Sequence, residues 1–265
     1  MSKRNNLPVA LTIAGSDSGG GAGIQADLKT FAAVGVHGTS AITCITAQNP
    51  VRVAGIQACT PKIVRAQIEA VFAELQPAAI KTGMLYSAGI LGAVVEFLQR
   101  PNLPPLVVDP VMLSTSGARL LKRSALNRLK QQLLPLATLV TPNLDEAEWL
   151  LGRKLKSVAA LRSAAKELHE TFGCAALVKG GHLRGSKAAA DVFYDGHNEL
   201  LLTAPFIKGV STHGTGCTYA AAITAQLALG HRLPRAVELA KEHITQAIAR
   251  YQIAGGHPVL NNFWR

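Results

Sequence analysis

Short apolar runs alternate with segments of helical periodicity along almost the whole chain. Apolar runs bounded by glycine or polar residues are typical of buried strands, whereas apolar positions spaced three and four apart are typical of amphipathic helices. We expect strands at residues 8–14, 40–46, 52–58, 78–81, 106–109, 138–140 and 175–178, and a hairpin that joins 190–194 to 199–203. We expect helices at residues 24–34, 61–75, 88–98, 125–134, 144–151, 158–171, 216–229 and 236–253.

This alternation predicts a single α/β domain over residues 1–265, built on a mostly parallel, doubly wound sheet flanked by helices. No internal repeat, low-complexity tract or long linker divides the chain. Ligands of such sheets bind beyond the carboxyl ends of the strands, so the loops that follow strands are where chemistry is expected.

Composition narrows the class of ligand. Hydrophobic residues make up 48% of the chain but aromatic residues only 5%, which suits helices on a parallel sheet. The formal charge is +11, yet the basic residues are scattered rather than gathered along one face. We therefore expect no nucleic-acid partner, and a positive field that favours small polyphosphate ligands.

The cysteines and the apolar runs suggest a compartment. The four cysteines have neither CxxC nor metal-ligand spacing. We find no signal peptide, and no apolar stretch reaches transmembrane length. We expect a cytoplasmic protein with reduced thiols and no membrane partner.

Two glycine-rich segments are candidate anion sites. Gly15 to Gly23 follows the first strand, and its glycines allow close backbone approach to a ligand, although a flexible turn is an alternative. Ser211 to Thr218 leads directly into an Ala-rich helix, whose start suits a transferring phosphoryl group. A thiol at this position should have a lowered pKa, so Cys217 is expected to be partly ionised; the alternative is a small residue at a close helix–strand contact.

Polar residues at strand ends suggest a metal-assisted phosphate site. Asp109 follows one strand, and Glu146 lies just after another; such carboxylates can hold Mg²⁺ against substrate phosphates. Lys179 ends a strand before two glycines and could meet a phosphate. The alternatives are that Asp109 caps a turn, that Asn143 only N-caps its helix, and that Lys179 is merely solvated.

Taken together, the motifs resemble one family, the hydroxymethylpyrimidine/phosphomethylpyrimidine kinases. The segments that carry the resemblance are residues 14–29, 46–49, 81–85, 108–112, 141–147, 179–182 and 212–217. The resemblance implies a ribokinase-like fold, a homodimer, and two successive ATP-driven phosphorylations in thiamine biosynthesis, with Mg²⁺ as the cofactor of ATP.

The resemblance also implies roles for single residues. The pyrimidine site would be lined by Gly15, Asp27, Gln48, Met84 and Val111. ATP would be bound by Asn143, Glu146, Lys179 and Thr215, and Mg²⁺ by Asp109 and Glu146. The catalytic group would be Gly214, Gly216 and Cys217, with Cys217 as general base where most related sugar kinases carry Asp.

Two other functions were weighed. A pyridoxal kinase of the same superfamily is the closer one, but the variants that resemble this chain carry a second Cys in the segment that here reads Leu113 to Gly117. That segment also lacks the Lys that is frequent near Thr115 in the pyrimidine kinases. A non-catalytic binding protein is disfavoured because the positions of Asp109, Glu146 and Cys217 are all filled.

Overall fold

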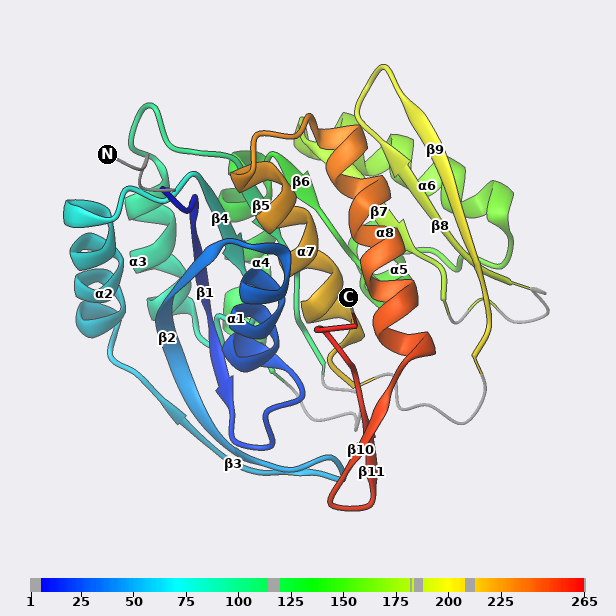
Figure 1. Ribbon diagram of the computed structural model, residues 1–265. Coiled ribbons are helices and arrows are strands. Elements are labelled where there is room, and N and C mark those ends of the chain that lie inside the picture. The colour runs from blue at the N-terminus through cyan, green and yellow to red at the C-terminus, as the bar shows by residue number, and fades with distance from the viewer. Residues whose placement is uncertain (1–5, 114–119, 182, 184–187, 208–212, 265) are drawn as a thin grey trace, which may run out of the picture.

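The part of the chain that the computed structural model describes forms a nine-stranded sheet between two layers of helices (Figure 1). The described residues are 6–113, 120–181, 183, 188–207 and 213–264. The strand order is β3-β2-β1-β4-β5-β6-β7-β8-β9. The strands are β1 (Val9–Asp17), β2 (His37–Gln48), β3 (Val53–Ala58), β4 (Ala79–Thr82), β5 (Leu106–Val108), β6 (Leu139–Val140), β7 (Ala175–Lys179), β8 (Ala188–Tyr194) and β9 (Glu199–Pro205).

The inner strands run parallel and the outer ones antiparallel. Strands β2, β1, β4, β5, β6 and β7 form the parallel part, and β3, β8 and β9 are antiparallel to their neighbours. All four residues of β4 and all three of β5 are buried, as in a parallel sheet covered on both faces. The α/β, mostly parallel class expected from the sequence is confirmed.

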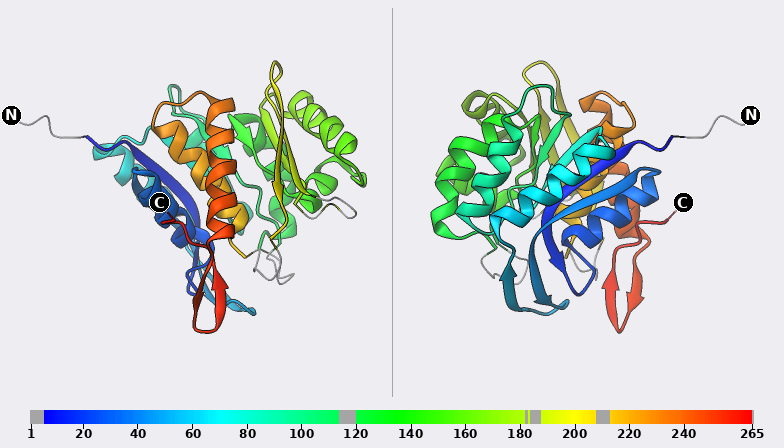
Figure 2. Two further views of the ribbon diagram at one scale, coloured as in Figure 1. Left: turned by 45° about the vertical axis from the view of Figure 1, so that its right-hand side comes forward. Right: turned by 90° about the vertical axis from the view of Figure 1, so that its left-hand side faces the viewer.

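The helices cover both faces of the sheet. They are α1 (Gly23–Val34), α2 (Pro61–Glu74), α3 (Ala88–Leu98), α4 (Arg123–Arg128), α5 (Leu144–Leu151), α6 (Val158–Phe172), α7 (Thr215–Ala228) and α8 (Leu233–Ala249). Helices α1, α7 and α8 pack on one face, and α2 to α6 on the other (Figures 1 and 2). Among the described helices, none combines the length and apolar character needed to cross a membrane.

Two helices differ from the sequence prediction because of proline. The helix expected at 125–134 is the short α4, followed by a π-helical turn at Leu129–Leu133 and a 3₁₀ turn at Leu134–Leu136, since Pro135 has no N–H with which to continue the α-helical ladder. The last helix begins at Leu233 rather than at residue 236, because Pro234 fits the first turn of a helix.

The end of the chain forms a hairpin that the sequence prediction missed. Helix α8 ends at Ala249, and β10 (Gln252–Ala254) pairs with β11 (His257–Val259). Gly255 and Gly256 join them with φ of 56° and 81°, a backbone that favours glycine. The hairpin projects at the same end of the molecule as the carboxyl ends of the parallel strands (Figures 1 and 2).

Candidate active site

The site lies beside β1, where the order of the strands reverses: after β3, the chain adds its strands on the other side of β1. Strands β2 and β3 lie on one side of β1, and β4 to β9 lie on the other. Such a switch point opens a crevice beyond the carboxyl ends of the strands. Strand β1 ends at Asp17, β4 at Thr82 and β5 at Val108, so the residues that follow them meet at one edge of the sheet.

Asp17 organises the glycine-rich loop between β1 and α1. Its Oδ1 accepts the N–H of Gly19 at 2.8 Å, and its Oδ2 accepts those of Gly21 at 3.1 Å and Ala22 at 2.9 Å. The Nε2 atom of His213 lies 3.0 Å from the same Oδ2. Burial raises the pKa of Asp17, but the hydrogen bonds from His213 and the backbone outweigh it and hold the pKa below its usual value. The loop is therefore ordered by an ionised carboxylate and is not merely a flexible turn.

Gly214 begins α7 in a position that only glycine can fill. Its φ is 79°, and a Cβ atom would lie 1.8 Å from the carbonyl oxygen of Gly21. The first helical hydrogen bond runs from the N–H of Thr218 to the carbonyl of Gly214, so the N–H groups of residues 215–217 precede the helical ladder. These groups and the helix dipole favour an anion at this end of α7.

Cys217 is protonated in the ligand-free protein. Removal from water raises the pKa of its thiol to about 11, and the Lys81 ammonium and the N–H of Gly23 offset this only in part. The expectation of a partly ionised thiol near neutral pH is therefore wrong for this state. The sequence indicated only the helix start, whose field lowers the pKa of a thiol. The packed structure shows that the thiol also loses hydration, which raises its pKa by more.

Asp109, Lys179 and Thr141 meet beside the start of α7. Lys179 Nζ lies 2.9 Å from Asp109 Oδ1, and the hydroxyl of Thr141 donates to the same oxygen at 3.2 Å. A Cβ atom on Gly216 would lie 3.2 Å from Lys179 Nζ and 3.8 Å from Asp109 Oδ2. The start of α7 and this charged cluster are thus adjacent, and Lys179 is not a merely solvated side chain.

Glu146 belongs to the same cluster through the start of α5. Its side chain accepts the N–H of Asn143, whose own side chain accepts the N–H of Glu146, both at 2.9 Å, in a reciprocal capping box. Burial raises the pKa of Glu146 to about 7; Lys179 lowers it and Asp109 raises it further. Asn143 does cap its helix, and by doing so it fixes the carboxylate near the Lys179–Asp109 pair.

The donor set fits a magnesium ion that is shared with substrate phosphates. Mg²⁺ prefers carboxylate oxygens and water, and it usually takes only one or two carboxylates from the protein. Asp109, which follows β5, and Glu146, in the first turn of α5, supply that number. In the described part of the chain, no group of three or more His, Cys, Asp or Glu side chains could hold an ion without other ligands.

A small apolar cluster adjoins the bulge in β1. It contains Cys44, Met84 and Leu120, with Ile56, Tyr86 and Val111 packed against them. Gly15 lies at a register shift between β1 and β2, where a Cβ atom would lie 2.8 Å from Cys44 Sγ and 3.2 Å from Met84 Sδ. Three of the residues assigned to the pyrimidine site, Gly15, Met84 and Val111, are therefore brought together. Cys44 of β2 is their neighbour.

Gln48, the last residue of β2, lies beside the glycine-rich loop. Its Oε1 accepts the hydroxyl of Thr46 at 3.2 Å, and its Nε2 lies 3.4 Å from Nε2 of His213. Because His213 also contacts Asp17, the side chain of Gln48 is held at the edge of the crevice. An amide so held can present both a donor and an acceptor to a ligand ring.

Asp27 lies in the protein interior and not in the crevice. Its side chain is fully buried and forms an ion pair with Lys81, whose Nζ is 2.9 Å from its Oδ2. The carboxylate is therefore not open to a ligand entering from the crevice, contrary to its assignment to the pyrimidine site. The sequence signal that was missed is Lys81 itself, a lysine within a run of buried strand residues.

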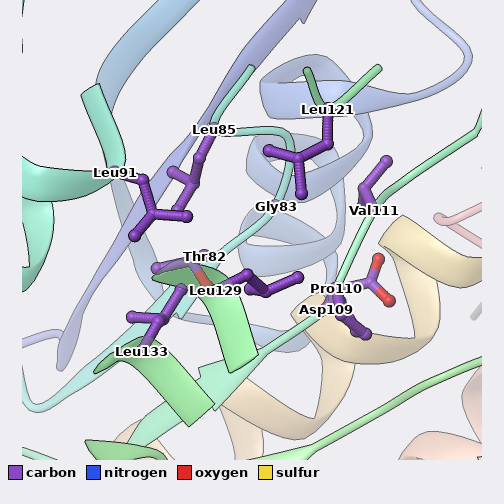
Figure 3. Close-up of a pocket in the computed structure, with 10 residues that line it drawn as sticks. All are labelled: Thr82, Gly83, Leu85, Leu91, Asp109, Pro110, Val111, Leu121, Leu129 and Leu133. Atoms are coloured by element: carbon purple, nitrogen blue, oxygen red, sulfur yellow. The ribbon is translucent and has the colours of Figure 1, made fainter. Parts of the chain in front are cut away.

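A small pocket adjoins Asp109 but is too small for a substrate (Figure 3). Its volume is about 10 Å³, with Leu91 and Leu133 on one side and Asp109 and Val111 on the other. That is roughly the space needed by one water molecule. Thr82, whose hydroxyl has no hydrogen-bond partner among the described residues, also lines it and could bind such a water.

Sequence reasoning also missed the structural roles of Asp17, His213 and Thr141. Asp17 was visible as an acid before a run of glycines, and His213 as a neighbour of the second glycine loop, but their mutual contact spans 196 residues of sequence separation. Three motif residues, His182, Ser211 and Thr212, and residues 114–117 of the segment after Met112, lie outside the described residues.

Comparison with known proteins agrees with this geometry. A family model described as phosphomethylpyrimidine kinase matches residues 17–261. The chain belongs to this family. The hydroxymethylpyrimidine/phosphomethylpyrimidine kinase of Synechococcus elongatus is 46% identical over 250 residues, which cover 94% of each chain. That of Bacillus subtilis is 42% identical over 255 residues, covering 96% of this chain and 94% of the relative.

Solved structures show that the family's ribokinase-like fold is present here. A phosphomethylpyrimidine kinase from Clostridium difficile is 44% identical with a TM-score of 0.81, covering 91% of this chain and 99% of that one. A pyridoxal kinase from Bacillus subtilis, solved with ADP, is 37% identical with a TM-score of 0.88, covering 97% and 98%. The fold is thus common to both kinds of kinase, and the substrate must be argued from the site.

Proposed function

We propose that this protein transfers the γ-phosphoryl group of ATP to 4-amino-5-hydroxymethyl-2-methylpyrimidine and then to the resulting monophosphate, as a step of thiamine biosynthesis. Curated relatives with 42% to 46% identity carry the name hydroxymethylpyrimidine/phosphomethylpyrimidine kinase. A relative from Geobacter sulfurreducens, of which this chain spans about half, is a thiamine biosynthesis bifunctional protein.

One observation carries the proposal: the apolar cluster around Met84, taken as the floor of the pyrimidine site, and the start of α7 lie against the same glycine-rich loop. Gly15 and Met84 contribute to the floor, and Gly214 begins the helix whose third residue is Cys217. Gly23 joins the two regions, since it bridges to Ser16 of β1 and its N–H lowers the pKa of Cys217. A pyrimidine on the floor would direct its substituent toward the start of α7.

The chemistry requires positioning and electrostatic stabilisation more than covalent participation. The hydroxyl oxygen of the pyrimidine attacks the γ-phosphorus while the bond from that phosphorus to the ADP oxygen breaks. The thiolate form of Cys217 takes the hydroxyl proton, and the N–H groups at the start of α7 bind the equatorial oxygens. In the second transfer the acceptor is an ionised phosphate, so little proton removal is needed.

ATP and its metal would occupy the charged cluster. Lys179 and Thr215 would bind phosphate oxygens, and Asn143 would hold the start of α5 in place. Asp109 and Glu146 would bind Mg²⁺ directly or through water, and the ion would neutralise phosphate charge when bound.

Three further properties belong to the same proposal. We propose a homodimer, which sedimentation analysis of the purified protein would test. We propose a cytoplasmic location, supported by four free cysteines, and no nucleic-acid or membrane partner, supported by the scattered basic residues. Salt-dependent retention on DNA would contradict the last of these.

The deciding experiment mixes the purified protein with Mg-ATP and, separately, the hydroxymethylpyrimidine, its monophosphate and pyridoxal, followed by product analysis. Turnover of both pyrimidines with little turnover of pyridoxal is the expected result. Turnover of pyridoxal alone would mean that the phosphoryl-transfer site is as described but that the ring bound at Gln48 and Met84 is a pyridine. The similarity to the Bacillus subtilis pyridoxal kinase makes this comparison necessary.

A further inference from the structure

The Lys81–Asp27 ion pair is more deeply buried than any other among the described residues. Both side chains have 0% exposure, and the hydroxyl of Thr12 donates to the same carboxylate oxygen at 2.6 Å. Taking two charges out of water costs several kcal/mol per ion, and apolar replacements of buried pairs are often as stable. Stability alone therefore does not explain the pair, and its position relative to Cys217 becomes important.

The register of the strands places Lys81 on the side of the sheet that carries α7. An apolar cluster between the sheet and helices α1 and α7 contains Ala10, Phe31, Val36, Ala79, Ala221, Ala225 and Ala228. Thr12 follows Ala10 by two residues on β1, and Lys81 follows Ala79 by two on β4. Residues two apart on a strand face the same side. Thr12 and Lys81 thus form the next layer toward the carboxyl ends of their strands.

The helices complete this polar layer. Asp27 precedes Phe31 by four residues on α1, and Cys217 precedes Ala221 by four on α7, so each lies one turn above the apolar cluster on the same helix face. Helices α1 and α7 pack side by side, and α7 also packs on β4 (Figure 1). The N–H of Gly23, the first residue of α1, acts on Cys217 and lowers the pKa of its thiol. The thiol therefore lies at the start of two helices, with the ion pair behind it.

Four charged groups act on this thiol from the elements around it. Lys81 of β4 and Lys179 of β7 are cationic, whereas Asp27 of α1 and Asp109 after β5 are anionic. After desolvation, Lys81 has the largest influence on the pKa of Cys217 and lowers it; Asp27 and then Asp109 raise it. The ammonium, not the carboxylate, is thus the dominant member of the pair toward the thiol.

We propose that Lys81 is a positioning residue for phosphoryl transfer: its ammonium, held in place by Asp27 and Thr12, stabilises the thiolate of Cys217 that accepts the proton of the acceptor hydroxyl. The base role of the thiolate rests on the proposed function. During the first transfer the proton passes from the hydroxyl to sulfur as the new O–P bond forms and the bond to ADP breaks. Lys81 keeps its own proton throughout.

The test is the alkylation rate of Cys217 by iodoacetamide in the full-length protein, read at this residue by peptide mass spectrometry between pH 7 and 9. In this range the rate follows the thiolate fraction. An opposite charge nearby typically changes a pKa by about one to three units, so Lys81→Met should slow alkylation about tenfold or more. Asp27→Asn keeps an oxygen acceptor for Thr12 and Lys81 but removes the negative charge, so it should accelerate alkylation.

A matched control is the Lys–Asp pair that joins α8 to β8. Lys241 Nζ lies 2.7 Å from Asp191 Oδ2, and both side chains are largely buried. Lys241→Met should leave the alkylation of Cys217 unchanged. A merely structural role for Lys81 would loosen the site in both variants of the pair and move both rates in the same direction. That result, or an unchanged rate in Lys81→Met, would overturn the proposal.

Two further readouts keep the test decisive. If Lys81→Met does not fold, as judged by circular dichroism, Asp27→Asn decides by itself, because a rate that does not rise contradicts the proposal. The alkylation requires no pyrimidine, so its failure leaves the proposed kinase activity standing. Conversely, the expected alkylation pattern without turnover of either pyrimidine would refute the proposed function instead. In the active enzyme, Lys81→Met should reduce kcat of the first phosphorylation more than that of the second.

Discussion

Lys179 Nζ lies 2.9 Å from Asp109 Oδ1, although 70 residues separate them in the chain. The two side chains meet because β6 pairs with both β5 and β7, so that Asp109 and Lys179 reach the same edge of the sheet. Both are largely buried, with 12% and 4% of the lysine and aspartate side chains exposed. The two residues therefore stabilise each other in the packed structure, and the lysine can also offer its positive charge to a phosphate.

Lys179→Met, compared with a double variant, should separate the stabilising role of the pair from the role of the lysine in binding ATP. It removes the cation that we assign to ATP and leaves Asp109 buried without its partner, so we expect weaker nucleotide binding and a loss of about 3–5 kcal/mol in the free energy of unfolding. The double variant Asp109→Asn/Lys179→Met should recover most of the stability but none of the activity. Calorimetric titration with ATP and urea denaturation measure the two effects. Recovery of activity in the double variant would contradict the assignment.

Cys217→Ala should affect the two phosphorylations unequally. A positioned general base typically contributes about a hundredfold or more, so kcat of the first transfer should fall by about that factor. The second transfer has an ionised acceptor and should fall less than about tenfold. Single-turnover assays with each pyrimidine separate the two steps. Equal losses would show that Cys217 shapes the site rather than removing a proton.

The pH dependence of the first transfer follows from the raised pKa of this thiol. Because the pKa of Cys217 is about 11 in the ligand-free protein, the thiolate fraction is small at neutral pH and grows with every unit of pH. The rate of the first transfer should therefore rise between pH 7 and 9, and this rise should be absent in Cys217→Ala. A flat profile in the unmodified protein would indicate that ligand binding itself ionises the thiol.

Gly214→Ala should abolish activity by collision rather than by backbone strain alone. Its Cβ would lie 1.8 Å from the carbonyl oxygen of Gly21, and its φ of 79° is unfavourable for alanine. Gly230→Ala is a matched control, since Gly230 has a φ of 86° but no atom within 4 Å of a Cβ. We expect the control to lose only about 1 kcal/mol and to keep its activity. Thermal melts and initial rates distinguish the two; similar losses in both would contradict the collision.

Glu146→Gln should make the protein more stable at alkaline pH. The pKa of Glu146 is about 7 in the folded protein against 4.5 for a free side chain, so the folded state binds this proton more tightly. Stability from this group is complete below pH 4.5 and is lost as the pH rises through 7, which amounts to about 3 kcal/mol.

Glutamine retains an oxygen for the N–H of Asn143 but does not titrate. The difference in the free energy of unfolding between Glu146→Gln and the unmodified protein should therefore grow between pH 5 and 8 in ligand-free denaturation experiments. The variant should lose activity with Mg-ATP, because the carboxylate assigned to the metal is gone. A stability difference that is independent of pH would contradict the raised pKa.

Local sequence signals determined most of the elements. The helix expected at 88–98 is α3 with the same bounds, and the helix expected from residue 61 begins there, with Thr60 as its N-cap. Such signals succeed because capping and periodicity act within a few residues. The hairpin at Gln252–Ala254 and His257–Val259 was missed because the predicted last helix was extended to residue 253, over the first strand of the hairpin, whereas α8 ends at Ala249.

The sequence by itself determined the class of fold and the family, and it supplied the residues that we propose for phosphoryl transfer, because strand–helix alternation and motif order are local properties of the chain. Only the tertiary structure decided which charges face one another. It withdrew Asp27 from the crevice into a pair with Lys81, and it raised the pKa of Cys217 where a helix start alone predicted the opposite. Hydration lost on packing and charges brought together from distant strands have no counterpart in sequence spacing, and they set the protonation states on which the reaction depends.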